Sequence, residues 1–153
     1  MKKQTVGWIG AGRMGYEMAA RLAKGGADVL VWNRTREKAV PLTKYGAKVA
    51  DELPELASRD IVFCMVSTGK DVNEVVARLL KGKERPKMIV ECSSISLEGS
   101  AKLRQLLEKR RIQYLAAPVS GNARVIKAGK LSFVCSGPQK AVYRPVKAAW
   151  PRG

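Results

Sequence analysis

The chain has 153 residues, of which 46% are hydrophobic, and this suits one domain with a buried core. It contains no run of about 18 apolar residues and no histidine, which argues against a membrane span and excludes histidine-based acid–base chemistry or metal binding. The basic start leads into a glycine-rich turn rather than a signal-peptide core, so we expect a cytoplasmic protein, and the net charge of +16 favours anionic ligands.

Short apolar runs alternate with helical patterns along the chain. The first run, 6–9, precedes an amphipathic helix at 13–24 that ends at Gly25-Gly26, and the second, 29–32, precedes a helix capped by Thr35 that runs to about Tyr45. This alternation is typical of an α/β fold with a doubly wound, mostly parallel, Rossmann-type sheet, here as one domain over 1–153. Further strands are expected at 61–66, 88–90, 112–115 and 131–134, and further helices at 51–58, 71–80, 97–111 and 139–149.

Cysteines and basic clusters give less specific signals. Cys64, Cys92 and Cys135 lie in apolar runs without a C-x-x-C pair, so we expect buried, reduced thiols rather than a metal site or a disulfide. Basic residues cluster at 81–87 and 109–111, but no aromatic residues alternate with them as platforms for bases. We therefore expect solvated helix faces and no nucleic-acid partner.

A glycine motif stands between the first strand and the first helix. Gly10-Ala11-Gly12-Arg13-Met14-Gly15 has the G-x-G-x-x-G spacing in the context that dinucleotide sites require. Gly10 would allow a tight turn, Gly12 the approach of a pyrophosphate, and Gly15 close packing of helix on strand. The pyrophosphate would accept hydrogen bonds from the helix N-terminus. The motif predicts a dinucleotide cofactor, whereas a plain βα turn would explain the glycines alone.

The second strand ends about 20 residues further on, where the adenosine ribose is read. NAD sites commonly have Asp or Glu at this position, but the sequence reads Asn33-Arg34-Thr35. The Arg34 guanidinium suits a 2′-phosphate, and Thr35 adds a hydroxyl. We therefore expect NADP as the cofactor. The alternative is an NAD site beside a surface arginine.

Four segments carry a family resemblance. Residues 7–15 read G-W-I-G-A-G-R-M-G, 31–35 read V-W-N-R-T, 91–96 read E-C-S-S-I-S and 117–121 read A-P-V-S-G. They resemble, in order, the G-x-I-G-x-G-x-M-G, second-strand, D-x-S-T and A-P-V-S-G-G motifs of the β-hydroxyacid dehydrogenases. That family includes 3-hydroxyisobutyrate dehydrogenase, glyoxylate/succinic semialdehyde and tartronate semialdehyde reductases, 6-phosphogluconate dehydrogenase-like proteins and the related imine reductases. The resemblance covers nearly the whole chain.

The resemblance implies roles for individual residues. Met65, Val66 and Ser67 would line the adenine-ribose side, and Ser94 would lie near the nicotinamide. Loops at the carboxyl ends of parallel strands are also where such sheets bind ligands. Helix capping is the alternative for Ser93 and Ser94, and a turn is the alternative for Ser120. The expected cofactor-binding residues are Gly10, Ala11, Gly12, Arg13, Met14, Gly15, Asn33, Arg34, Thr35, Met65, Val66, Ser67 and Ser94, and the expected substrate-binding residues are Ser120, Gly121 and Asn122.

The sequence departs from the family at two points. Asn122 stands where a second glycine is usual, which would re-aim the substrate loop. The family's catalytic lysine belongs to a G-x-G-x-x-x-K segment of a helical second domain, and neither Lys127 nor Lys130 lies in such a motif. We therefore expect that lysine, and the helical domain that commonly forms the dimer, to lie outside this chain, which would be a fragment or a truncated product. No catalytic residue is assigned.

The sequence thus predicts the NADP-binding domain of an oxidoreductase that transfers hydride between nicotinamide and a small hydroxyacid or aldehyde. The expected partners are a small carboxylate or aldehyde substrate and a second copy through the helical domain, without a metal or a membrane. Two alternatives stay open. One is an imine reductase-like enzyme, and the other is a noncatalytic nucleotide-binding or scaffold module with nucleic-acid affinity, as in chromatin-associated relatives.

Overall fold

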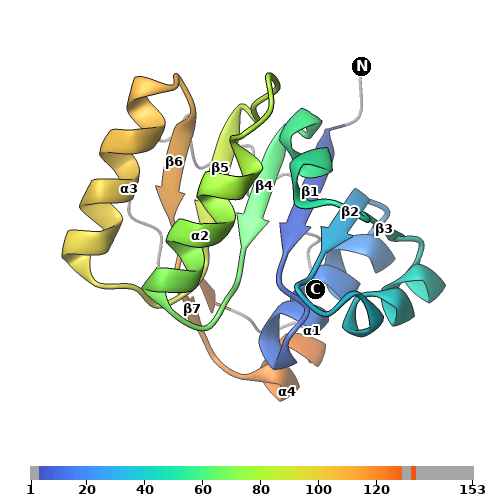
Figure 1. The fold of residues 1–153 in the computed structure, drawn as a ribbon. Coiled ribbons are helices and arrows are strands. Elements are labelled where there is room, and N and C mark those ends of the chain that lie inside the picture. The colour runs from blue at the N-terminus through green and yellow to red at the C-terminus, as the bar shows by residue number, and fades with distance from the viewer. Residues whose placement is uncertain (1–3, 129–131, 134–153) are drawn as a thin grey trace.

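A parallel sheet forms the centre of the protein, for which a computed structural model describes residues 4–128 and 132–133. Its strands lie in the order β3-β2-β1-β4-β5-β6 (Figure 1). The strand order reverses between β1 and β4, the arrangement of a doubly wound sheet, so the expected Rossmann-type fold is confirmed. The strands are β1 (Thr5–Ile9), β2 (Asp28–Trp32), β3 (Lys48–Val49), β4 (Ile61–Cys64), β5 (Met88–Glu91) and β6 (Gln113–Ala116).

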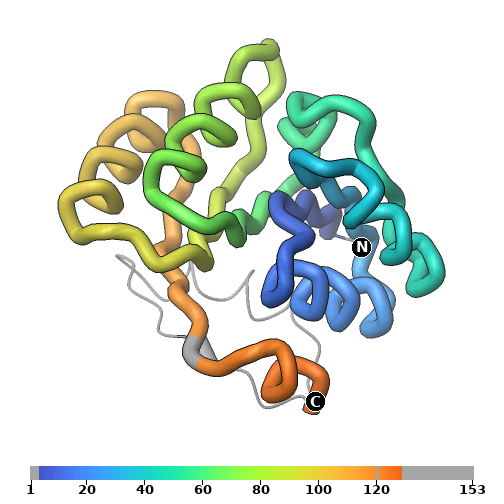
Figure 2. The backbone as a smooth tube through the Cα atoms, turned by 60° about the horizontal axis from the view of Figure 1, so that its bottom comes forward, coloured from blue at the N-terminus to red at the C-terminus, as the bar shows by residue number. Residues whose placement is uncertain are grey.

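Helices cover both faces of this sheet, as Figures 1 and 2 show. One face packs against α1 (Arg13–Lys24), the 3₁₀ helix η2 (Val40–Tyr45) and α4 (Ala123–Lys127). The other packs against the 3₁₀ helix η3 (Leu53–Ser58), α2 (Gly69–Leu79) and α3 (Leu97–Lys109). Successive side chains of the central strands enter opposite cores, and Trp8 stacks on Phe63 in the first core with ring centroids 5.3 Å apart. The central strands are therefore apolar on both faces, because a helical layer covers each face of the sheet.

Several elements differ from the sequence-based expectation. The helix expected from Thr35 to Tyr45 is two 3₁₀ pieces, η1 (Arg36–Lys38) and η2, and Thr35 makes no side-chain capping bond. Pro41 cannot donate a backbone hydrogen bond within a continuous α-helix, and it lies instead in the first turn of η2. The helix expected at 51–58 is also 3₁₀ (η3), and the strands β3 and β7 (Val119–Ser120) and the helix α4 were not anticipated.

The expected strand at 131–134 does not join the parallel sheet. Its described part, β8 (Ser132–Phe133), pairs antiparallel with β7 (Val119–Ser120) in a separate small sheet. The β4 strand ends at Cys64, two residues earlier than expected. Helix α2 begins before Asp71 because the Thr68 hydroxyl accepts a hydrogen bond from the Asp71 N–H at 3.1 Å. The helix expected at 139–149 lies outside the described residues.

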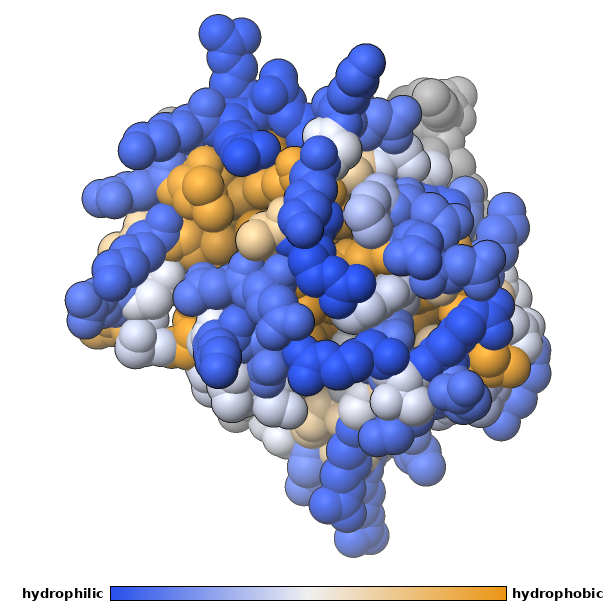
Figure 3. Space-filling view, viewed as in Figure 1, coloured by the Kyte–Doolittle hydropathy of each residue, from blue (hydrophilic) through white to orange (hydrophobic). Residues whose placement is uncertain are grey.

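Basic residues gather at the edge of the sheet where α2 and α3 end. The Arg110 guanidinium donates to the carbonyl oxygen of Leu80 at 3.3 Å, and the Gln113 N–H donates to that of Lys87 at 3.0 Å, which joins the two basic clusters. Figure 3 shows hydrophilic side chains projecting from this edge. Within the described part of the chain, no helix combines the length and the apolar character that crossing a membrane requires.

Gly10 joins the first strand to the first helix at a point with no room for a side chain. Its φ is +108°, and a Cβ at this position would fall on the carbonyl oxygen of Met65. Its N–H donates to the carbonyl oxygen of Trp32 at 3.0 Å, while the Met65 N–H donates to that of Ile9 at 2.8 Å. The ends of β1, β2 and β4 are therefore held together at one backbone crossing.

This crossing predicts a large effect of Gly10→Ala on stability. Gly26 is a matched control, because it has a similar φ of +92° but no atom within 4 Å of the place that a Cβ would take. Gly26→Ala should lower the free energy of unfolding by about 1–2 kcal/mol through backbone strain alone. Gly10→Ala adds a clash with backbone and should lower it by about 3 kcal/mol or more. Urea denaturation of both variants measures the difference, and equal losses would contradict the proposed crowding.

Candidate functional site

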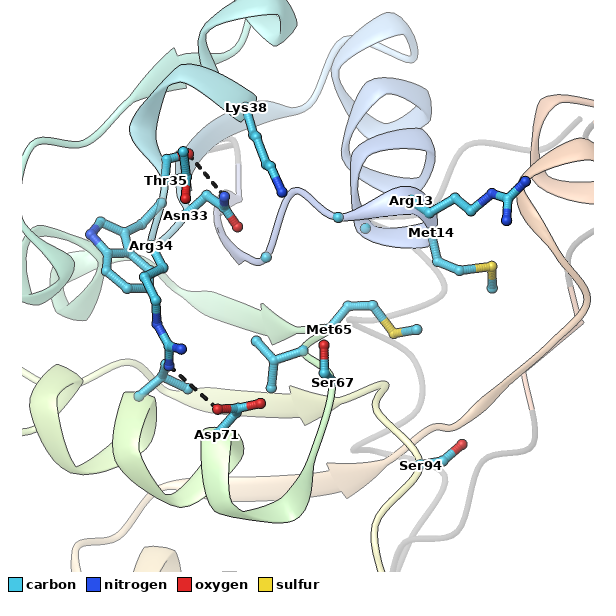
Figure 4. Close-up of a pocket in the computed structure, with 16 residues that line it drawn as sticks. Arg13, Met14, Asn33, Arg34, Thr35, Lys38, Met65, Ser67, Asp71 and Ser94 are labelled. Atoms are coloured by element: carbon cyan, nitrogen blue, oxygen red, sulfur yellow. Dashed lines mark hydrogen bonds and ion pairs between the residues drawn. The ribbon is translucent and has the colours of Figure 1, made fainter.

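A cavity of about 610 Å³ opens at the carboxyl edge of the sheet, beside the reversal of strand order (Figure 4). Four loops surround it, those that follow β1, β2, β4 and β5. Parallel α/β sheets bind their ligands at this place. Of the residues expected from the sequence, the cavity brings together Gly10, Gly12, Arg13, Met14, Gly15, Asn33, Arg34, Thr35, Met65, Val66, Ser67 and Ser94.

The glycine-rich loop forms one wall and places the N-terminus of α1 at the cavity. A Cβ on Gly15 would meet the carbonyl oxygen of Gly10, which also accepts a hydrogen bond from the Trp8 indole at 2.8 Å. Gly12, the N-cap of α1, has no protein atom within 4 Å of a Cβ position. No side chain caps α1, and its first turn holds no acidic residue. The positive end of this helix is therefore available to an anion.

Asn33 ties the second-strand loop to the glycine loop. Its Oδ1 accepts a hydrogen bond from the Ala11 N–H at 2.8 Å, and its Nδ2 donates to the carbonyl oxygen of Thr35 at 2.9 Å. The Ala11 N–H is thus already bonded, and Ala11 lines a second cavity rather than this one. Asn33 sets the distance between the two loops, a role that the cofactor motif alone did not indicate.

Arg34 extends across the mouth of the cavity to α2. Its Nη2 lies 3.4 Å from Asp71 Oδ1 and 3.6 Å from Glu74 Oε2, and 62% of the Arg34 side chain is exposed. The Thr68 hydroxyl donates to Asp71 at 2.9 Å and, together with the Arg34 guanidinium, lowers the pKa of the Asp71 carboxyl. Ion pairs this exposed contribute little to stability, about 0–1 kcal/mol. An arriving anion can therefore replace the carboxylates on Arg34.

The sequence reasoning missed two charged residues that line the cavity, Lys38 and Asp71. Lys38 lies one 3₁₀ turn beyond Thr35, whose carbonyl oxygen accepts the Lys38 N–H at 3.1 Å. Figure 4 shows its amine directed toward the glycine loop. The position of Lys38, four residues after Arg34, could have indicated a second cation at the cavity. The T-x-x-D pattern from Thr68 to Asp71 could have indicated that a helix begins there and places Asp71 at the cavity.

A buried polar chain connects the loops after β4 and β5. The Glu91 Oε1 accepts a hydrogen bond from the Ser93 N–H at 2.7 Å, and the Ser93 Oγ accepts one from the Val66 N–H at 2.8 Å. Ser96, not Ser93 or Ser94, caps α3, accepting from the Gly99 N–H at 3.0 Å, so the capping alternative is wrong. Ser93 thus holds the two loops together, and Ser94 lines the cavity.

Glu91 is unusual within this chain of contacts because its carboxyl group is buried. Its Oε2 has no hydrogen-bond partner among the described residues, and burial raises the pKa of Glu91 to about 7. The neighbouring Cys64 thiol is also buried, and its pKa is raised well above the ordinary value, chiefly by that burial. Cys64 and Cys92 are buried, as expected, while Cys135 lies outside the described residues.

Of the expected substrate residues, Gly121 and Asn122 do not line this cavity. Ser120 belongs to β7, Gly121 follows it with φ +134°, and Asn122 caps α4 by accepting a hydrogen bond from the Val125 N–H at 3.0 Å. Lys127 forms an ion pair with Glu17 at 3.5 Å, and Lys130 lies beyond the described part of the chain. Asn122 thus caps α4 through its side chain, a hydrogen bond that a second glycine could not make.

Comparisons with known proteins agree with this arrangement. The family model for the NAD binding domain of 6-phosphogluconate dehydrogenase matches residues 5–148. Glyoxylate/succinic semialdehyde reductase 2 of Arabidopsis thaliana, a chloroplastic protein, is 32% identical over 137 residues, which are 87% of this chain and 38% of that protein.

Two solved structures are similar over nearly the whole chain. One is 3-hydroxyisobutyrate dehydrogenase of Mycobacterium tuberculosis with L-serine, with a TM-score of 0.89 and 27% identity over 97% of this chain and 51% of that one. The other is Psf3 in complex with NADP+ and 2-OPP, with a TM-score of 0.83 and 28% identity over 97% of this chain and 55% of that one. The chain therefore spans 38% to 55% of the length of these three proteins.

The buried carboxyl predicts how stability depends on pH. Because burial raises the Glu91 pKa from 4.5 to about 7, its contribution is intact below pH 4.5 and is lost as the pH rises through about 7. Glu91→Gln removes this ionisation. We expect the variant to gain stability relative to the unmutated chain from near zero at pH 4.5 to about 3 kcal/mol at pH 8.

Denaturant unfolding at several pH values checks this prediction. Glu108→Gln changes an exposed carboxyl on the neighbouring α3 and controls for the loss of one negative charge. A stability difference between Glu91→Gln and the unmutated chain that stays constant with pH would show that Glu91 is not the titrating group.

Proposed function

Because the chain belongs to the family of the NAD-binding domain of 6-phosphogluconate dehydrogenase, we propose that it is the NADP-binding domain of an oxidoreductase. The observation that carries this proposal is the uncapped N-terminus of α1, which opens into a cavity bordered by Arg34 and Lys38. A pyrophosphate at α1 would accept hydrogen bonds from the free N–H groups of the first turn. The domain would occupy 1–153, since the family match extends to residue 148.

The preference for NADP rests on the charges beside the second strand. No carboxylate stands at the end of β2 to accept a hydrogen bond from a ribose 2′-hydroxyl, and the Asn33 amide is used within the loops. A 2′-phosphate would instead meet Arg34, Thr35 and Lys38. Arg34 has to leave Asp71 and Glu74, and a doubly charged phosphate offers it a stronger partner than two exposed carboxylates. The bound NADP+ of the similar Psf3 structure supports this choice.

The other end of the cavity would receive the nicotinamide. Ser94 lies there, on the loop that Ser93 joins to the loop carrying Met65 and Ser67. A nicotinamide cofactor supplies the hydride acceptor or donor, while these residues fix its orientation and exclude water on that side. We propose a small hydroxyacid or aldehyde as substrate, as the names of the similar reductase and dehydrogenase suggest. Ser120, Gly121 and Asn122 would bind its carboxylate.

Proton transfer to or from the substrate oxygen needs a further group. Among the expected substrate residues no side chain is suited to that task, and Lys127 is engaged with Glu17. The similar proteins are about twice as long as this chain. We therefore assign no proton-transfer residue among the described residues, and the family resemblance implies that a lysine of a helical second domain has this role.

The charges around Arg34 predict tighter binding of NADP+ than of NAD+. Arg34→Ala should remove about 1.5–3 kcal/mol from NADP+ binding and little from NAD+ binding, because the lost contact is a charge-assisted hydrogen bond to phosphate. Asp71→Asn should strengthen NADP+ binding several-fold by removing a competitor for Arg34. Calorimetric titration of each variant with both cofactors measures these changes.

Arg36→Ala is the matched control, since Arg36 is similarly exposed but pairs with Asp51 at 3.1 Å and does not line the cavity. It should leave the affinity for both cofactors nearly unchanged. Equal affinity of the unmutated chain for NADP+ and NAD+ would overturn the assignment of NADP.

A second prediction concerns turnover by the 153-residue chain. It should bind cofactor yet reduce glyoxylate and succinic semialdehyde, or oxidise 3-hydroxyisobutyrate, only very slowly, because it lacks an assigned proton-transfer group. The measurement is a steady-state assay at high protein concentration with NADP(H). Robust turnover would show that the proton-transfer residue lies within the chain.

A further inference from the structure

A second cavity lies on the other side of the glycine-rich loop, between α1 and α4. Its volume is about 680 Å³, roughly twenty times the share of one water molecule in the liquid, so a small organic molecule fits within it. Figure 2 shows α4 (orange) beside the start of α1 (blue). Gly12, Arg13 and Lys38 line both cavities, whereas Arg124 and Lys127 line only the second.

The lining of this second cavity carries an excess of positive charge. Four cationic side chains, Arg13, Lys38, Arg124 and Lys127, face one carboxylate, that of Glu17. Glu17 is only 17% exposed and pairs with Lys127 at 3.5 Å. Within the described residues, none of the other three cations has an ion-pair partner. Three uncompensated positive charges around one cavity favour a multiply charged anion.

These three cations come from separate parts of the chain. Arg13 begins α1, Lys38 ends η1, and Arg124 lies on α4. Figure 4 shows the Arg13 side chain directed away from the first cavity toward α4. The fold therefore brings together charges that repel one another, and no acidic side chain among the described residues neutralises them. A bound anion would do so.

We propose that the second cavity binds a small organic anion with at least two negative charges, such as a phosphate ester or a di- or tricarboxylate. Arg124 and Arg13 hold it from opposite sides, while Lys38 closes the boundary with the first cavity. The anion binds alongside the cofactor, a feature that rests on the proposed function, whereas the anion site itself does not. This site differs from the expected substrate residues Gly121 and Asn122, which line neither cavity.

Occupation of this site would connect the two loops on which the proposed reaction depends. Helix α4 follows Asn122 directly, and Ile126 anchors it in the core that α1 shares. Arg13 stands at the first position of α1, next to the glycine loop. An anion between Arg13 and Arg124 therefore fixes the glycine loop relative to the segment that follows Ser120 and Gly121.

Isothermal titration calorimetry of the 153-residue chain tests the site, with pyrophosphate and citrate as polyanionic probes and acetate as a monoanion at the same ionic strength. With the first cavity filled by saturating NADP+, we expect saturable 1:1 binding of pyrophosphate or citrate, and none of acetate. The better of the two probes distinguishes a phosphate ester from a polycarboxylate as the ligand class. Arg124→Ala should weaken binding tenfold or more. Arg85→Ala removes the same charge from an exposed loop at the opposite edge of the sheet and should change the affinity less than twofold.

Three results would overturn the proposal. The first is the absence of saturable polyanion binding. The second is equal weakening by Arg85→Ala and Arg124→Ala, which would indicate general charge attraction only. The third is loss of polyanion binding at saturating NADP+, which would place the anion in the first cavity. If NADP+ itself fails to bind while the Arg124-dependent site persists, the proposed function fails and the anion site stands.

Discussion

The close approach of two backbone segments at Gly10 is the constraint on which the rest of the structure depends. There the turn after β1 passes so near the Met65 carbonyl oxygen that only a hydrogen atom fits on the Cα. The same contact sets the start of α1 against the ends of β2 and β4. The Asn33 side chain then bonds the loop after β2 to the glycine loop, and the Ser93 side chain bonds the loop after β5 to the loop after β4. The walls of the first cavity are thus placed by hydrogen bonds to main chain, which leaves the cavity-facing side chains free to vary with the ligand.

The charges around the first cavity determine which ligands it attracts. The open end of α1 and the cations Arg34 and Lys38 make it attractive to phosphates, whereas Asp71 and Glu74 occupy Arg34 in the absence of a ligand. Displacing these carboxylates costs every anion that binds Arg34 the same free energy, and a doubly charged phosphate gains the most from the guanidinium in return. The acidic residues of α2 therefore set how much an anion must gain at Arg34 before it binds there.

Sequence patterns predicted the parallel sheet, α1 to the residue and the residues around the first cavity, because these depend on local periodicity and on glycine spacing. They did not predict the 3₁₀ segments, because the helical pattern of 35–45 does not show where Pro41 interrupts it and starts a new first turn. The antiparallel pairing of β7 with β8 was missed because a short apolar run does not reveal its partner. The link from Glu91 through Ser93 to Val66 was missed for the same reason, as it connects two loops that lie far apart in the sequence. The family assignment was predicted and confirmed, whereas the cofactor preference, the substrate and the roles of the site residues stay predictions.

Some cationic side chains have favourable partners within the protein, and others among the described residues have none. At the edge where α2 and α3 end, Arg78 and Lys109 lie at the negative ends of helix dipoles, Arg110 donates to the Leu80 carbonyl, and Lys87 pairs with Asp60. These cations already have favourable partners, so they need no nucleic acid to explain them. At the opposite edge, Arg13, Lys38 and Arg124 stand near the positive end of α1, where a cation is disfavoured and where no described carboxylate pairs with them. The proposed anion would compensate both the helix and these side chains, which no described carboxylate does.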